Sequence, residues 1–242
     1  MSPITSNEVV ARAPASKEQD PPKLVKEPVR FAFHTIGISL SGILALTLDP
    51  LIATYLLIIF VFISMSGEFL RCNEQIQQWP NWTLLSPLAR LAASISVREH
   101  ELGTRSATLD FFLAFAITWT FCTPEVVAVA CFITAWADPL ARVVGKNWGK
   151  TKWPRSQKTP IGSGACWLVA TIVCAFALLV QGRGLATVVV SAVIVGLCTA
   201  LAELIPQYPS KPKPGDILTP ADNFWLMIIV SMAIVACTSF LP

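Results

Sequence analysis

The chain has 242 residues, of which 54% are apolar and 14% charged, and its formal net charge at pH 7 is +3. A mean hydropathy of +0.61 lies well above the values of soluble globular domains. The composition therefore excludes that class and predicts an integral membrane protein. No nucleic-acid partner is expected.

Residues 1–27 differ from the rest of the chain. They combine prolines with charges of both signs, such as Glu8, Lys17 and Asp20, and contain no long apolar run. We expect a disordered cytosolic tail here, because such a segment cannot bury enough apolar surface to fold. A secretory signal needs an apolar core and a transit peptide is poor in acids, so neither is expected. The membrane domain is predicted to comprise residues 28–242.

Seven windows are long and apolar enough to cross a hydrocarbon core of about 30 Å as helices. An eighth stretch, Trp79–Val97, is interrupted by two prolines and Arg90, so we expect an interfacial or re-entrant helix there. The predicted fold is therefore an all-α membrane domain with about seven transmembrane helices. Their ranges are Phe31–Leu48, Pro50–Leu70, Ala107–Cys122, Pro124–Val144, Ile161–Gln181, Gly184–Leu204 and Asp222–Leu241.

Charge indicates which helix ends face the cytosol. With a cytosolic N-terminus and seven spans, every Lys and Arg except Arg183 falls on the cytosolic side. Counting Trp79–Val97 as a span would move the basic loop at 142–158 across the membrane and remove this bias. Most acids fall on the same side, whereas a transporter would more often place ionisable residues at mid-membrane depth. The sequence thus predicts a polar site at the cytosolic membrane boundary.

Six of the seven cysteines lie within or at the edges of the apolar windows, and no Cys-x-x-Cys pair occurs. We expect them to be small buried side chains rather than disulfides or metal ligands. Only two His are present, so a His-based zinc site is not expected.

Asp138 and Pro139 interrupt the fourth predicted span. Proline removes a backbone donor and clashes with the preceding turn, so we expect a break or kink, with Asp138 as the N-cap of a short second helix. Helical spacing places a carboxylate, a guanidinium and two glycines along one stripe of this segment. They belong to Asp138, Arg142, Gly145 and Gly149. This stripe suits a metal-bound polyphosphate; a purely capping Asp138 is the alternative.

The segment GKNWGKT at residues 145–151 ends like a nucleotide P-loop. The match fails, because it has three residues between its glycines where a P-loop has four, and it follows a membrane helix rather than a strand. What remains is a set of glycines that let backbone N–H groups approach phosphate, beside several cations. A positive-inside anchor would explain the cations alone, which are Lys146, Lys150, Lys152, Arg155 and Lys158.

Two carboxylates from later spans are expected to face this loop. Glu203 ends the sixth span, and Asp222, beside Asn223, begins the seventh. A role in stabilising the helix N-terminus is equally supported for Asp222 taken alone. Together with Asp138, these acids could supply the oxygen ligands that Mg²⁺ shares with substrate phosphates.

These motifs carry a family resemblance. The pattern resembles the CTP-dependent lipid kinases, which include dolichol kinase, phytol kinase and the CTP-dependent diacylglycerol kinase of fungal endoplasmic reticulum. The resemblance covers roughly Glu27 to the C-terminus, and its specific part is confined to the motifs. The residues that carry it are Asp138, Ala141, Gly145, Gly149, Lys158, Gly162, Glu203, Asp222 and Asn223.

The resemblance implies transfer of the γ-phosphoryl group of CTP to the hydroxyl of a membrane lipid. It assigns Asp138 to Mg²⁺ or to the lipid hydroxyl, with Glu203 and Asp222 completing the metal shell. Asp138, Arg30 and Lys158 are the expected catalytic residues. The residues expected to contact the nucleotide or its phosphates are Arg30, Arg142, Gly145, Lys146, Gly149, Lys150, Lys158 and Gly162.

The start of the first span departs from the family pattern. The family has an Arg-Lys pair shortly before a His, whereas RFAFH keeps Arg30 and His34 and puts Phe31 in place of the Lys. The departure points to a divergent substrate, a replacement by Lys26 or a lost activity. The segment REHELG, residues 98–103, is similar to the charged segment before the family's third span, and Glu101 is the expected counterpart of its acid.

Diacylglycerol is the favoured acceptor, because a short single-domain chain with a cytosolic tail suits a fungal-type diacylglycerol kinase better than a plastid phytol kinase. The expected location is the endoplasmic reticulum or nuclear envelope, with the site facing the cytosol. A polyprenol is the second candidate for the acceptor. The sequence is also compatible with a CTP:phosphatidate cytidylyltransferase, with a lipid-binding protein without catalysis and with a transporter. The oligomeric state is not predicted.

Overall fold

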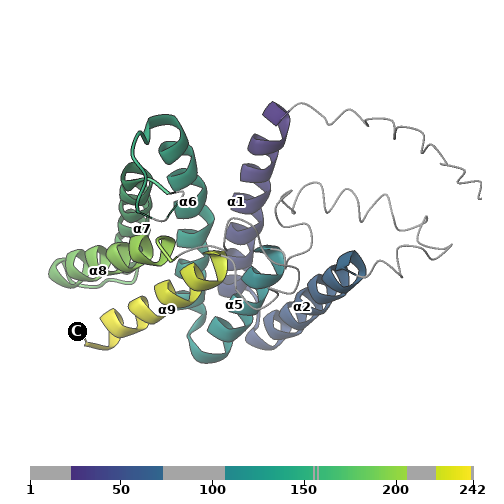
Figure 1. Cartoon of the computed structure of the whole chain (residues 1–242). Coiled ribbons are helices and arrows are strands. Elements are labelled where there is room, and N and C mark those ends of the chain that lie inside the picture. Colours follow the sequence, from purple (N-terminus) through teal and green to yellow (C-terminus); the bar gives the residue numbers. More distant parts are fainter. Residues whose placement is uncertain (1–22, 73–106, 155, 157, 206–221, 241–242) are drawn as a thin grey trace, which may run out of the picture.

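The computed structural model describes residues 23–72, 107–154, 156, 158–205 and 222–240, and all of its regular structure there is helical (Figure 1). All seven predicted apolar spans are helices. The helix α1 begins at Lys23, so residues 23–27, expected in the tail, belong to it. The predicted helix at Trp79–Val97 and the acid Glu101 lie outside the described residues. The helices are α1 Lys23–Thr47, α2 Pro50–Cys72, α5 Ala107–Phe121, α6 Pro124–Trp148, α7 Pro160–Val180, α8 Leu185–Glu203 and α9 Asp222–Phe240.

Three of these helices, α6, α7 and α8, are long and apolar enough by themselves to cross a membrane. The apolar parts of α1, α2, α5 and α9 are shorter. Many large apolar side chains face outward, including Phe62, Phe176 and Val180. A surface of this kind is typical of a protein surrounded by lipid. The described part of the fold is therefore all-helical and consistent with a membrane protein, while the seven-span topology stays a prediction.

Helix starts follow from local sequence. Pro50, Pro124 and Pro160 each begin a helix, where a residue without an N–H costs nothing. The Asp49 carboxylate accepts from the Leu51 N–H at 2.9 Å and caps α2. Gly182 adopts a positive φ of 73°, which only glycine readily accepts, and so lets α7 turn into α8.

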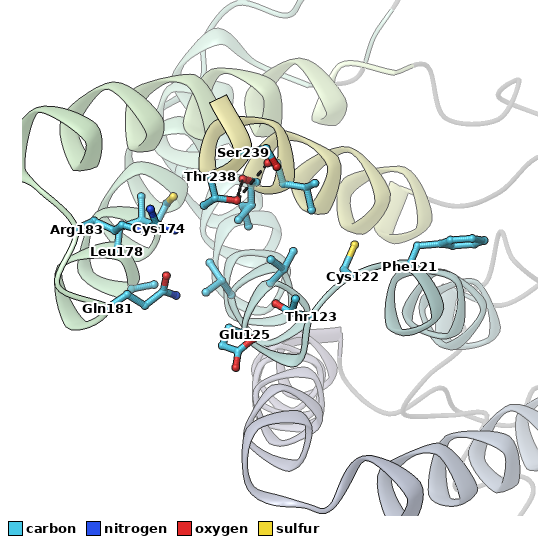
Figure 2. A pocket seen from close by; sticks show the side chains of 15 residues that line it. Phe121, Cys122, Thr123, Glu125, Cys174, Leu178, Gln181, Arg183, Thr238 and Ser239 are labelled. Carbon is cyan, nitrogen blue, oxygen red and sulfur yellow. Dashed lines mark hydrogen bonds between the residues drawn. The ribbon is translucent and has the colours of Figure 1, made fainter. Parts of the chain in front are cut away.

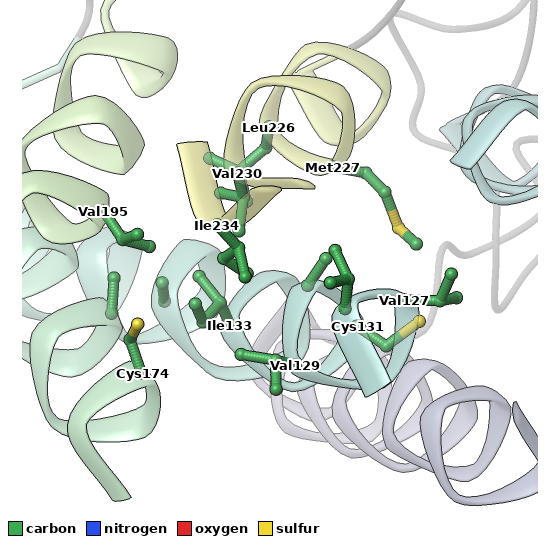
Figure 3. Close-up of a cluster of buried hydrophobic side chains, with 14 of the residues drawn as sticks. Val127, Val129, Cys131, Ile133, Cys174, Val195, Leu226, Met227, Val230 and Ile234 are labelled. Carbon is green, nitrogen blue, oxygen red and sulfur yellow. The ribbon is translucent and has the colours of Figure 1, made fainter. Parts of the chain in front are cut away.

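The helix α6 lies at the centre of the bundle, between α1 and α7, and α9 packs on it as well (Figure 1). Figure 3 shows Val127 and Ile133 of α6 in one apolar cluster with side chains of α9, which are Leu226, Met227, Val230 and Ile234. Most α6 residues from Val126 to Ala141 are buried. Asp138 therefore lies in the buried part of this helix, and Arg142 follows one turn later at its exposed end.

Candidate functional site

Asp138 lies inside α6, which continues through Pro139 as a single helix from Pro124 to Trp148. The predicted break at Pro139, with Asp138 as an N-cap, is therefore wrong. Pro139 has no N–H, so the Ala135 carbonyl four residues earlier loses its helical partner. The Thr35 hydroxyl of α1 donates to that carbonyl at 3.2 Å, in a buried contact. This bond from another helix satisfies the backbone where the proline interrupts it.

Thr35 should therefore be required for the helix around Asp138. Thr35→Val keeps the shape of the side chain but leaves the Ala135 carbonyl buried without this donor, which should cost about 1–3 kcal/mol. Thr35→Ser keeps the hydroxyl and should cost less. Thermal unfolding of the detergent-purified variants measures the difference. Equal loss of stability in both variants would contradict this role of the hydroxyl.

Asp138 pairs with the next turn of its own helix. Its carboxylate is almost buried, and Oδ2 lies 3.7 Å from Nη2 of Arg142. The Arg142 side chain is 47% exposed, so the ion pair extends from the interior of the bundle to its surface. The predicted stripe thus places an anion inside and a cation at the edge of one helix end.

A second ion pair joins distant segments of the chain. Nζ of Lys158, in the connection between α6 and α7, lies 3.6 Å from Oε1 of Glu203 at the end of α8. Both side chains are largely buried. The structure therefore brings together the basic loop and one of the two later carboxylates.

Cys166 of α7 connects the two pairs, a role that its sequence context did not predict. Its thiol makes a hydrogen bond with Glu203 and lies within electrostatic reach of Asp138 and Lys158. The sequence predicted only a small buried side chain, which Cys166 is. A signal was present, because Gly162, Cys166 and Ala170 recur every four residues and form the buried face of α7.

The glycines of the motif lie where α6 crosses the start of α7. A Cβ at Gly145 would come 2.8 Å from the Thr159 hydroxyl, and one at Gly162 would come 2.8 Å from the Ala141 carbonyl. Thr159 is the N-cap of α7 and accepts from the Gly162 N–H at 3.1 Å. Gly145, Gly149 and Gly162 thus let α6 and α7 approach closely, and their contact with a nucleotide stays a prediction.

The connection between α6 and α7 is held by its own bonds. The Trp153 indole donates to the Ser163 hydroxyl at 3.2 Å, and the Trp153 N–H donates to the Lys158 carbonyl at 2.9 Å. The Lys158 N–H in turn donates to the Ser156 hydroxyl. These contacts fix the backbone of Lys158 and so direct its ammonium toward Glu203. Lys146 and Lys150 are exposed at the same end of the bundle.

For the remaining predicted site residues of α1 and α9, the structure gives a position in the helix. Asn223 is buried at the start of α9, and His34 is partly buried on α1 beside Thr35. Asp222 is the first residue of α9 and Arg30 belongs to α1, but both side chains lie outside the described part of the structure. Asp110, to which the sequence assigned no role, is fully buried in the first turn of α5.

The carboxylates fit the chemistry of Mg²⁺ only in part. Asp138 and Glu203 offer the oxygen donors that Mg²⁺ prefers, whereas the Cys166 thiol is a soft donor that suits other metals. Among the side chains that the structure describes, no group of three or more His, Cys, Asp or Glu could hold a metal ion. A Mg²⁺ ion here would need further oxygens, such as nucleotide phosphates. The Mg²⁺ site stays a prediction.

Comparison with known proteins gives one relevant similarity. No protein-family profile matches the chain, and no solved structure does. The chain is 24% identical over 163 residues to CTP-dependent diacylglycerol kinase 1 of Saccharomyces cerevisiae, a match that covers 66% of this chain and 50% of the yeast protein. This weak homology supports the CTP-dependent lipid kinase family, without pointing to a specific member.

Proposed function

We propose that the protein phosphorylates diacylglycerol with CTP at the cytosolic face of the endoplasmic reticulum or nuclear envelope. The observation that carries this proposal is the pair of buried carboxylates at one end of the bundle, Asp138 and Glu203, each beside a cation. Phosphoryl transfer needs positioning and charge neutralisation more than covalent chemistry. A site of alternating acids and bases at a membrane boundary can provide both to a water-soluble donor and a lipid acceptor.

In the proposed reaction, the buried carboxylate acts on the lipid hydroxyl and the more exposed cations bind the phosphates. The Asp138 carboxylate would accept the proton of the lipid hydroxyl while the hydroxyl oxygen bonds to the γ-phosphorus of CTP. The bond between the γ-phosphorus and the oxygen that bridges it to the β-phosphate would break, and CDP would leave. Arg142 and Lys158 would turn from their carboxylates to the phosphates, with Lys146 and Lys150 at the exposed edge. Mg²⁺ bound with the nucleotide would neutralise charge on its phosphates.

Phe31 is the feature that weighs most against catalysis. It lies one turn before Thr35 on α1, and therefore on the face that Thr35 presents to α6. A lysine at position 31 would carry its ammonium toward the same end of α6 as Asp138. The absence of this lysine favours, as a second candidate, a lipid-binding protein that does not catalyse phosphoryl transfer.

The test is a labelled-phosphate assay with the purified chain in detergent. We would incubate it with γ-labelled CTP or ATP, Mg²⁺ and diacylglycerol, dolichol or phytol, and follow the label into lipid. Phosphatidate labelled from CTP, with release of CDP, is the expected result. Release of pyrophosphate would instead identify nucleotidyl transfer, and labelled dolichol or phytol would change the acceptor.

Phe31→Lys separates a divergent kinase from an inactive one. If the chain is an active kinase with a divergent substrate, the substitution should change its activity less than tenfold, roughly the effect of one surface charge contact. No label with any donor and acceptor, together with label restored by Phe31→Lys, would reject the kinase proposal for the natural chain. Ala32→Lys, at an exposed position of α1, is the matched control.

A further inference from the structure

A cavity of about 480 Å³ lies at the opposite end of α6 from the candidate site. Figure 2 shows side chains from the connection between α5 and α6, from the end of α7 and from the end of α9 around it. Glu125, at this end, and Asp138 are thirteen residues apart on one helix, which corresponds to about 20 Å at 1.5 Å per residue. The cavity is therefore separate from the carboxylates and cations described above.

The rim of the cavity carries charge of both signs. Glu125 contributes a carboxylate that makes a hydrogen bond with the Thr123 side chain, and Arg183 contributes a guanidinium beside Gln181. Figure 2 shows Glu125 and Arg183 on different sides of the opening. Arg183 is also the one cation that the predicted topology leaves outside the cytosolic face. A ligand that offers both an anion and a cation would match this rim.

Most of the wall of the cavity is apolar, although Thr238 and Ser239 of α9 also line it. Val126, Val129 and Leu178 are buried, and so is Ile234 of α9, which also lines the cavity. A volume near 480 Å³ is within the range of small-molecule sites, which is about 300–1,000 Å³. The combination of a charged rim and an apolar wall at a membrane boundary suits a molecule with a polar head and a hydrocarbon tail.

We propose that this cavity binds a zwitterionic phospholipid through its head group and the first part of one acyl chain. Arg183 takes the phosphate, Glu125 takes the amine, and the acyl chain lies among Val126, Leu178 and Ile234. An anionic head group without an amine would leave Glu125 unmatched, and an uncharged lipid would leave both charges unmatched. The inference does not depend on the kinase proposal, because it concerns the other end of the bundle.

Protection of Cys122 tests the proposal in the unmodified chain. Cys122 is partly buried and lines the cavity, whereas the partly buried Cys198 of α8 does not line it. Phosphatidylethanolamine in mixed micelles should slow N-ethylmaleimide labelling of Cys122 and leave Cys198 unaffected, as quantified by peptide mass spectrometry. Equal labelling of Cys122 with and without the lipid would overturn the proposal.

Variants and other lipids test the charge match. Arg183→Gln and Glu125→Gln should each weaken the apparent affinity for phosphatidylethanolamine about tenfold, the loss of one hydrogen bond to a charged group. Asp49→Asn, which changes another exposed acid, should not change it. Equal protection by phosphatidylglycerol, by diacylglycerol or by soluble glycerophosphoethanolamine would overturn the zwitterionic phospholipid assignment.

Discussion

Asp138→Asn is expected to lower kcat for lipid phosphorylation about 100-fold or more, as is typical when a group that acts in the transition state is removed. Asparagine has the same shape and still offers an oxygen, but it carries no charge and cannot take the proton of the lipid hydroxyl. The side chain is almost buried, so water cannot easily replace it. Phosphate transfer per molecule of folded protein is the quantity to measure.

The protein should still fold after this change. Arg142 is 47% exposed, so water can solvate its guanidinium when the carboxylate 3.7 Å away becomes an amide. A half-exposed ion pair of this kind contributes at most about 1 kcal/mol. The unfolding midpoint of Asp138→Asn in detergent should therefore stay close to that of the natural chain.

Asp49→Asn is the matched control for Asp138→Asn. Asp49 is exposed and caps α2 through the Leu51 N–H, a role that asparagine performs equally well. The control should keep both activity and stability. If Asp138→Asn kept full activity while remaining folded, Asp138 would not be a catalytic residue and the proposed mechanism would be rejected.

The positions of the helices could be predicted from the sequence, because apolar length and prolines at helix starts are local signals. The spans beginning at Pro50 and Pro124 start at those residues in the structure. Continuity at Pro139 could not be predicted, since it depends on a hydroxyl a hundred residues away at Thr35. The loss of a backbone donor at a proline can be predicted from the sequence, but the hydrogen bond that compensates for it forms only in the packed bundle.

The candidate site was predictable as a set of charges, but its pairing was not. The sequence placed Lys158 and Glu203 at the same membrane face, and the structure shows which cation reaches which carboxylate. Cys166 entered the site only through packing, because a cysteine in an apolar helix gives no local sign of its neighbours. The sequence predicted that the glycines admit phosphate; helix packing, the second explanation, emerges only from the structure.

Two glycines of α7 now separate these explanations. A Cβ at Gly162 would lie 2.8 Å from the Ala141 carbonyl, whereas a Cβ at Gly164 would meet nothing within 4 Å. The Ala141 carbonyl is backbone, so relief of the clash requires α6 and α7 to move apart. Gly162→Ala should therefore destabilise the protein by about 1–3 kcal/mol, the usual cost of overpacking.

Gly164→Ala is the matched control on the same helix, and it should stabilise the protein by up to about 1 kcal/mol, because alanine is the better helix former. The unfolding midpoints of the two variants in detergent should thus move in opposite directions. Gly162→Ala should also lower activity, since Ala141 lies one turn from Asp138 and Thr159 follows Lys158 directly. An unchanged midpoint with lost activity would instead indicate that Gly162 serves the phosphate directly, because a glycine needed only for packing cannot be replaced without a change in stability.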